Sequence, residues 1–252
     1  MSPNTTLKQL LIVCRLRLPV TSMCVIDPGW NSNLKFESQM TRDEHEVMNM
    51  FLNKETVISK GPGRVPMDYQ HIYERDSFFP LSKLGQQVLP RALLQHQARQ
   101  KELKIRITHE NGKGKEPVKK AAIVKVKVDD LHIFNPRHQY DCRISINLEI
   151  NLHGRDDLAD FESLYLHDDT GNRQADRIKD RLSYKHLAYS IDLTKVDSGG
   201  ESTYELELEL DSTVLRQQME NVKSGRPDAY GDVVSGFLDN AVYLMRHRPE
   251  SK

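Results

Sequence analysis

Two rows of charged side chains, opposite in sign and close together in the sequence, are the residues best suited to chemistry. The acidic row consists of Glu205, Glu207 and Glu209. The basic row consists of Arg177, Lys179 and Arg181. Successive side chains of a strand point to opposite faces, so each row would occupy one face of a strand. Carboxylate oxygens are preferred ligands of hard divalent cations, whereas a row of Lys and Arg suits a phosphate.

A third strand-like segment joins the two rows. It runs from Leu187 to Lys195, carries Asp192 and Thr194, and is followed by a Gly199-Gly200 turn of the kind that hairpins use. Like charges side by side on a strand repel, so the acidic row needs cations, a metal ion or open water opposite it. One interpretation is therefore a charged sheet face in solvent. The other is that the two rows face each other across an enclosed space.

Further segments alternate polar and apolar residues with a period of two. The expected strands are Gln9 to Val20, Leu34 to Glu37, Tyr69 to Arg75, Lys104 to Thr108, Val124 to Val128, Leu131 to Phe134 and Arg143 to Ile150. Their polar positions include Arg106, Lys125, Lys127 and Glu149. Charged faces on so many strands favour a closed barrel with a charged interior, because closure also removes unpaired strand edges. Such an interior would hold one small anion, and triphosphate is the obvious candidate.

Four helices are expected outside these strands. Thr41 with Glu44 forms a capping box that would start a helix ending near Asn53. Ser212 to Lys223 and Asp232 to His247 have the apolar spacing of helices that cover a sheet. The stretch 76–101 alternates turn formers with leucines and indicates a short surface helix.

The composition is that of an ordinary globular protein. The 252 residues are 38% apolar and 29% charged, and 36 basic residues balance 36 acidic ones, so no overall field would attract nucleic acid or membrane. Three cysteines without CxxC spacing argue against a disulfide framework. The apolar run Leu10 to Cys14 is too short to span a membrane. We expect a cytosolic or nuclear protein with one domain over 15–252, preceded by a poorly defined segment 1–14.

Five of these motifs, in this order, resemble the fungal mRNA 5′-triphosphatases, which are the beta subunits of the mRNA-capping enzyme in the triphosphate tunnel metalloenzyme superfamily. The motifs are Val128 to Phe134, Arg143 to Glu149, Lys179 to Tyr184, Ile191 to Thr194 and Glu205 to Glu209. The resemblance covers roughly residues 15–245. It implies an α+β, mostly β fold: an antiparallel eight-stranded tunnel with a charged interior and flanking helices.

The same resemblance implies a metal-dependent hydrolase that removes the γ-phosphate from the 5′ end of nascent RNA in mRNA capping. By position, the metal site would contain Glu207 and Glu209, with Glu205 at its margin. The implied catalytic residues are Glu149, Arg106, Lys179, Arg181 and Asp192, and the implied substrate-binding residues are Lys125, Lys127, Arg177 and Thr194. The cofactor would be Mg or Mn. A nuclear location, an mRNA guanylyltransferase partner and a homodimer are also implied.

The sequence departs from that family at its start. The family has a Glu-x-Glu pair on its first strand, and none precedes Arg15 here. Ser190 also stands where some relatives have arginine. The barrel would then lack its first strand or replace it with residues 5–14. The chain is either a truncated or mis-spliced record of an active enzyme, or a shortened homologue. The alternative function is a catalytically impaired or non-enzymatic barrel that binds a polyphosphate or an RNA end.

Overall fold

The computed structural model describes residues 9–17, 40–96, 102–110, 116–133, 140–155, 161–166 and 174–246, with backbone alone for 9–17. Its strands are β1 (Gln9–Arg17), β2 (Asp68–Pro80), β3 (Lys104–Glu110), β4 (Val118–Ile133), β5 (Asp141–Asn151), β6 (Arg177–His186), β7 (Tyr189–Ser198) and β8 (Glu201–Leu210). Its helices are α1 (Arg42–Ser59), α2 (Lys83–Gln87), α3 (Arg91–Leu94), η2 (Glu162–Leu164), α4 (Ser212–Lys223) and α5 (Tyr230–Arg246). No helix in this described part is long and apolar enough to cross a membrane.

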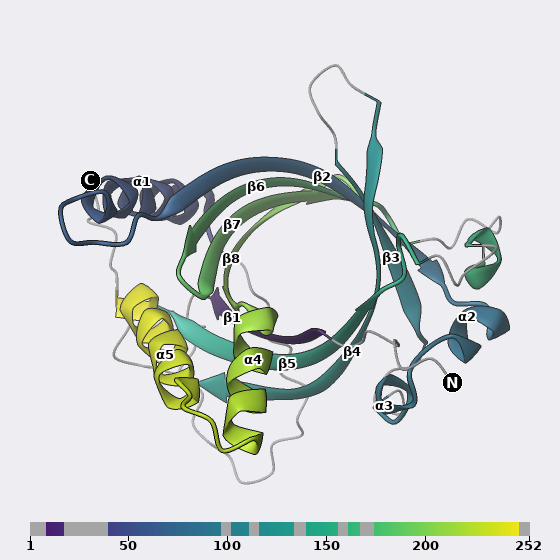
Figure 1. The fold of residues 1–252 in the computed structure, drawn as a ribbon. Coiled ribbons are helices and arrows are strands. Elements are labelled where there is room, and N and C mark those ends of the chain that lie inside the picture. Colours follow the sequence, from purple (N-terminus) through teal and green to yellow (C-terminus); the bar gives the residue numbers. More distant parts are fainter. Residues whose placement is uncertain are drawn as a thin grey trace, which may run out of the picture.

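The strands form a closed antiparallel barrel in the order β1-β5-β4-β3-β2-β6-β7-β8. Figure 1 shows them curling around a common centre. This confirms the mostly β, antiparallel tunnel expected from the sequence. β1 pairs with β5 on one side and with β8 on the other. The barrel therefore has a first strand, and β1 closes it. The strand predicted to start at Gln9 is therefore confirmed as β1, which includes residues 9–14.

Two apolar clusters lie between the barrel wall and the helices that cover it. One joins α1, α4 and α5 to the outer faces of β7 and β8 and includes Met48, Leu206 and Phe237. The other lies under α2, α3 and η2 and includes Leu93 and Val124. Figure 1 shows α1, α4 and α5 on one side of the barrel and α2 and α3 on the other. Because the apolar faces of β3, β4, β7 and β8 are turned outward to these helices, the alternating polar faces of these strands are turned inward.

The long helix α1 begins as predicted and ends later than predicted. Thr41 is its N-cap, and the capping box with Glu44 is present. The helix continues past Asn53 to Ser59, because no helix-breaking residue occurs before Gly61. Its last turn is capped at Lys60.

Several predicted strand boundaries were wrong. β2 does not stop at Arg75 but continues to Pro80, pairing with β3 and β6, so the predicted irregular stretch begins only after Pro80. The two short strands predicted around Val124 and Leu131 are one strand, β4, with an irregularity between Lys127 and Asp129. β7 starts at Tyr189 rather than Leu187, because Leu187 lies in a turn with φ of 55°.

The remaining boundaries differ less. α4 has the predicted bounds, and α5 begins two residues before Asp232 and ends at Arg246. The Gly199-Gly200 turn is confirmed by φ angles of 60° and 88°. The predicted strand Leu34 to Glu37 lies outside the described residues.

Gly85 of α2 allows this short helix to pack closely against η2. A Cβ atom built on Gly85 would lie 2.0 Å from the backbone oxygen of Leu164. We therefore expect Gly85→Ala to lower the free energy of unfolding by about 1–3 kcal/mol, as overpacking does. Urea denaturation measures this loss. The control is Gly231→Ala, whose Cβ would meet no atom within 4 Å. Equal stabilities of the two variants would contradict the steric argument.

Candidate functional site

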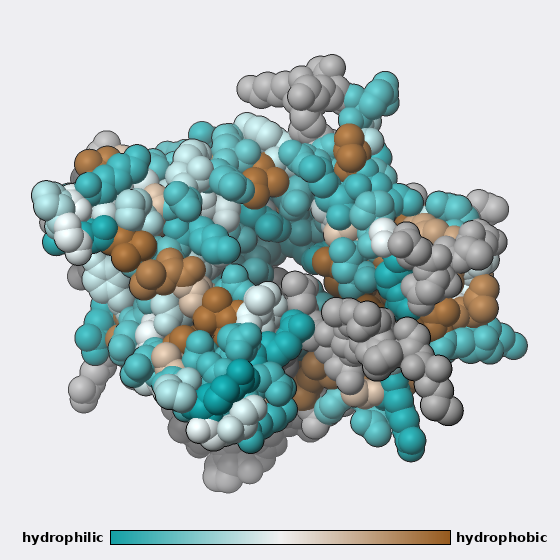
Figure 2. Space-filling view, viewed as in Figure 1, coloured by the Kyte–Doolittle hydropathy of each residue, from teal (hydrophilic) through white to brown (hydrophobic). Residues whose placement is uncertain are grey.

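A cavity of about 390 Å³ lies inside the barrel and is lined almost entirely by polar side chains. Predicted site residues that line it are Arg106, Lys125, Glu149, Arg177, Lys179, Arg181, Thr194, Glu205, Glu207 and Glu209. They come from β3, β4, β5, β6, β7 and β8. Figure 2 shows a hollow in the middle of the face viewed, with mainly hydrophilic residues around it. The acidic and basic rows thus face a shared enclosed space, as one of the two interpretations of the sequence required.

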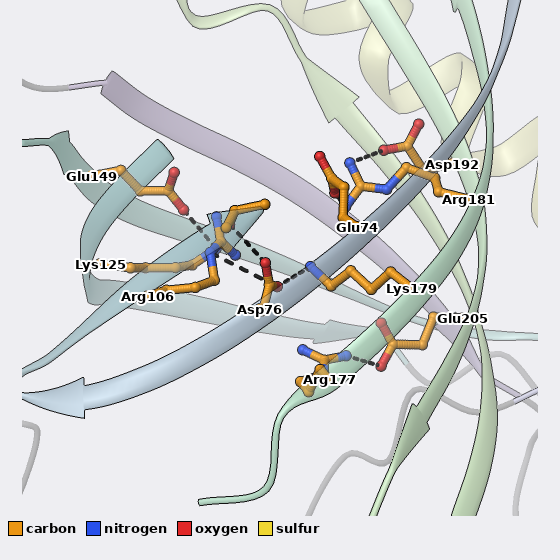
Figure 3. A network of polar contacts seen from close by, with 11 residues as sticks. Glu74, Asp76, Arg106, Lys125, Glu149, Arg177, Lys179, Arg181, Asp192 and Glu205 are labelled. Atoms are coloured by element: carbon orange, nitrogen blue, oxygen red, sulfur yellow. Dashed lines mark hydrogen bonds and ion pairs between the residues drawn. The ribbon is translucent and has the colours of Figure 1, made fainter. Parts of the chain in front are cut away.

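Lys179 is held in the barrel wall by a carboxylate that the sequence analysis missed. Its ammonium forms an ion pair with Asp76 of β2, which is 0% exposed, and the hydroxyl of Thr108 donates a 2.7 Å hydrogen bond to the same carboxylate. Arg106 is 4.0 Å from Asp76. Burial opposes ionisation of Asp76, but Lys179 and Arg106 outweigh it and hold the pKa of Asp76 below its ordinary value. Figure 3 shows Lys179 and Arg106 directed toward Asp76.

Burial also affects Lys179. It lowers the pKa of Lys179, and the neighbouring cations Arg106 and Arg181 act in the same direction, although Asp76 opposes them. An additional anion beside Lys179 would therefore be favoured, because it would offset the repulsion among these cations.

Arg181 is positioned between two carboxylates of neighbouring strands. Its guanidinium is 3.5 Å from Asp192 of β7 and 3.5 Å from Glu74 of β2. Asp192 also accepts a 2.6 Å hydrogen bond from Ser183. Burial raises the pKa of Asp192 although Arg181 lowers it. Asp192 therefore acts on Arg181 rather than lining the cavity itself (Figure 3).

The opposite wall carries a second buried ion pair. Lys125 of β4 lies directly across from Glu149 of β5 in the strand register, and the two side chains are 2.9 Å apart. Glu149 is buried. This pair lies on the wall of the cavity opposite the basic row. Cationic groups therefore line the cavity on several sides.

Three hydrogen-bond donors of the cavity are buried and make no hydrogen bond within the described part of the chain. They are Nε of Arg106, Nε of Arg181 and Oγ1 of Thr194. A buried donor without a partner costs free energy, so such groups usually satisfy a ligand or water. Together with the cations, they make the cavity suited to an oxyanion.

The acidic row is divided between an ion pair and a carboxylate cluster. Arg177 donates a 2.9 Å hydrogen bond to Glu205, so this glutamate already has a cation (Figure 3). Glu207 and Glu209 line the cavity nearby. Burial, together with the negative charges of Glu207 and Asp192, raises the pKa of Glu209 to about 7. A cation beside this carboxylate would offset both effects.

The donor set for a metal ion is small. In the described residues, no group of three or more His, Cys, Asp or Glu side chains is arranged to hold a metal ion. The backbone register of β1 places Val13 opposite Glu209 and Arg15 opposite Glu207, and Gln9–Arg17 contains no acidic residue. Mg²⁺, however, is commonly bound by one or two carboxylates together with substrate phosphates. Glu207 and Glu209 fit a divalent cation in that way, with the substrate as a further ligand.

Lys127 and Asp76 differ from the site that the sequence predicted. Lys127 does not line this cavity; it pairs with Asp130 at 2.6 Å and lines a neighbouring cavity. Asp76 was overlooked because the predicted strand stopped one residue before it. The alternation of Glu74 and Asp76 with Arg75 and Ser77 was the available signal, since it has the period of two of the strand that the structure shows.

Comparison with known protein families gives one match over most of the chain. The family described as mRNA capping enzyme, beta chain, matches residues 12–250. The mRNA-capping enzyme subunit beta of Schizosaccharomyces pombe is 30% identical over 240 residues, which are 92% of this chain and 68% of that protein. The subunit of the same name from Cryptococcus neoformans is 25% identical over 244 residues, which are 92% of this chain and 51% of that protein. The chain thus spans between about half and two thirds of these relatives.

The solved structures include a similar barrel. The RNA triphosphatase Pct1 of S. pombe, in complex with the Spt5 CTD, superimposes with a TM-score of 0.68 and 26% sequence identity. The match covers 96% of this chain and 88% of that one. Both the sequence and the fold therefore lead to the same group of proteins.

Proposed function

Because this chain belongs to the mRNA capping enzyme beta-chain family, which includes RNA triphosphatases, we propose that it removes the γ-phosphate from the 5′ end of nascent RNA. The observation that carries the proposal is the cavity, in which five cationic side chains converge with the three buried donors that make no hydrogen bond within the described residues. Phosphoryl transfer needs little covalent chemistry from the protein and much neutralisation of charge. The arrangement supplies that neutralisation.

The cations would hold the phosphate oxygens. Lys179 and Arg181 lie on one wall and Lys125 and Arg106 on others, so a triphosphate in the cavity would be contacted from several sides. Asp76 keeps Lys179 in place through its ion pair. In the same manner, Asp192 and Glu74 fix the guanidinium of Arg181, so both cations are oriented before the substrate binds.

Glu149 is the candidate to orient the attacking water. It is buried on the wall opposite the basic row, and its carboxylate is oriented by Lys125 at 2.9 Å. A carboxylate in this position would accept a hydrogen bond from water and receive its proton as the bond to phosphorus forms. The leaving group is the diphosphate end of the RNA.

Glu207 and Glu209 would hold a divalent cation, Mg or Mn, jointly with the phosphates. When bound, the cation would neutralise charge that develops on the phosphate oxygens. The two carboxylates keep that end of the cavity negative. Glu205 is not counted among the metal ligands, because it forms an ion pair with Arg177. Because the protein supplies few ligands, we expect the cation to bind weakly without triphosphate.

The cellular setting is part of the same proposal. A protein of mRNA capping would act in the nucleus on 5′-triphosphate RNA, next to an mRNA guanylyltransferase, and a homodimer is a further expectation. The S. pombe relative binds the Spt5 CTD, so a similar peptide is a candidate partner.

The test is release of inorganic phosphate from RNA labelled in its γ-phosphate. We expect release with Mg²⁺ or Mn²⁺ and none in EDTA. Lys179→Ala should reduce the rate by a factor of about 100 or more, because it removes a cation from the transferred phosphoryl group. Lys120→Ala is the matched control, since Lys120 is an exposed lysine that pairs with Glu110 on the β3–β4 side. Equal rates for the two variants would refute the proposed role of the cavity.

A non-catalytic barrel is the alternative that one observation favours. β1 brings no carboxylate opposite Glu207 and Glu209, which leaves fewer metal ligands than the family pattern implies. In that case the protein would bind triphosphate RNA tightly and release no label at any metal concentration.

A further inference from the structure

A second cavity, of about 380 Å³, adjoins the first through Arg106, Ile123 and Lys125, which line both. The first cavity extends to Asp211–Thr213, after the end of β8, whereas the second extends to Gln174, before the start of β6. β6 and β8 both pair antiparallel with β7, so they run in the same direction. The start of β6 and the end of β8 are therefore at opposite ends of the barrel. The first cavity runs from Arg177, at the start of β6, to the far end at Asp211–Thr213, whereas the second cavity lies at the end where β6 starts.

The two cavities differ in charge. The first is lined by the cations Arg106, Lys125, Arg177, Lys179 and Arg181 and by the carboxylates Glu149, Glu205, Glu207, Glu209 and Asp211. The second is lined by the cations Lys104, Arg106, Lys125 and Lys127, with Glu102 as its one lining carboxylate. A polyanion that continues beyond the triphosphate would thus be repelled less at the second cavity.

Phe78 gives the second cavity an aromatic wall. It lies opposite Arg106 in the register of β2 and β3 and two residues from Asp76, so its side chain shares their inward face. Among the described residues it belongs to neither apolar cluster. Its neighbour Phe79, in contrast, packs outward against the second cluster, with its ring 4.9 Å from that of Tyr165. A half-buried aromatic ring among cations is the combination that binds a nucleotide by base stacking.

We propose that the second cavity holds the 5′ nucleoside of the RNA and the backbone phosphate that follows it. Phe78 stacks on the base, and Lys104, which is 3.9 Å from Glu102, lies beside the backbone. The triphosphate then points along the shared residues Arg106 and Lys125 toward the carboxylates of the first cavity. This inference rests on the proposed function for the kind of substrate, and it adds the direction of the RNA and the residue that recognises its base.

The test is equilibrium binding in EDTA, where no hydrolysis interferes. The probes are a short 5′-triphosphate RNA with a fluorescent label at its 3′ end and unlabelled inorganic tripolyphosphate as a ligand without a base. We expect Phe78→Ala to weaken RNA binding about tenfold or more, as the loss of one stacked base does, and to change tripolyphosphate binding less than about twofold. Phe78→Tyr should bind like the wild type. Phe78→Leu, which keeps bulk without a ring, should resemble Phe78→Ala.

A second variant gives a direct signal for stacking. Phe78→Trp adds a tryptophan to a chain whose sequence has one other, Trp30, so the wild type supplies the background. Its fluorescence should be quenched by the triphosphate RNA and not by tripolyphosphate. If Phe78→Ala weakened the binding of RNA and of tripolyphosphate equally, Phe78 would have a structural role and the proposal would be wrong. Unchanged RNA binding in Phe78→Ala would also contradict it. If the wild type binds both ligands but releases no phosphate with metal, the proposed enzymatic activity is wrong. The binding of RNA and tripolyphosphate by Phe78→Ala still tests the nucleoside site in that case.

Discussion

Replacing Asp76 by alanine is expected to lower the free energy of unfolding at neutral pH by about 3–5 kcal/mol, the cost of breaking a buried ion pair on one side. Asp76 is 0% exposed and Lys179 is 6% exposed, so the variant would leave a buried ammonium without its partner and Thr108 without its acceptor. Urea denaturation measures the loss. Asp68→Ala on the same strand, where the side chain is exposed, should stay within about 0.5 kcal/mol of the wild type.

The pH dependence of this loss tests its electrostatic origin. The pKa of Asp76 is held below its ordinary value in the folded protein, so its ionised form stabilises the fold above the ordinary Asp pKa. That stabilisation disappears as the pH falls through the folded pKa. The stability difference between wild type and Asp76→Asn should therefore be largest near neutrality and should shrink in acid. A difference that does not change with pH would mean that packing, not charge, makes Asp76 necessary.

The same residue shows what the sequence allowed us to predict and what it did not. The two charged rows were predictable, because an unbroken period of two over β6 and β8 fixes which side chains share a face. Whether that face is turned to solvent or to an interior depends on what covers the other face, and here α1, α4 and α5 bury the leucines of β8. Asp76 was not predicted, although Glu74 and Asp76 keep the period of two of β2, because the strand was expected to end at Arg75.

The ion-pair partners of the basic row could not be predicted from the sequence either. Lys179 and Asp76 are about a hundred residues apart in the chain, and only the pairing of β2 with β6 brings them together. In the register, Asp76 is opposite Arg177 rather than Lys179, so the ion pair is diagonal and depends on the twist of the sheet. The number of carboxylates available to a metal was likewise not predictable from the acidic row alone, because one of the three is taken by Arg177.

Replacing Glu209 by glutamine is expected to have the opposite balance of effects: loss of activity without loss of stability. Glu209 is partly buried near Glu207 and Asp192, and removing its charge removes repulsion among them. The free energy of unfolding should therefore remain equal or rise, while phosphate release should fall about 100-fold or more, as expected when a group that stabilises the transition state is lost. Natural sites often retain such unfavourable charges because function requires them.

The control for Glu209→Gln is Glu201→Gln, at the exposed start of the same strand, which should alter neither quantity. Glu207→Gln should behave like Glu209→Gln if the two carboxylates hold one cation together. The double variant should then lose little more activity than either single one, because residues that act as a unit are not additive. If each single variant instead kept wild-type activity, the carboxylates would serve no metal, and catalysis would have to depend on the cations and Glu149. If both variants lost stability together with activity, the acidic row would be structural, and Glu209 would stabilise the fold as Asp76 does.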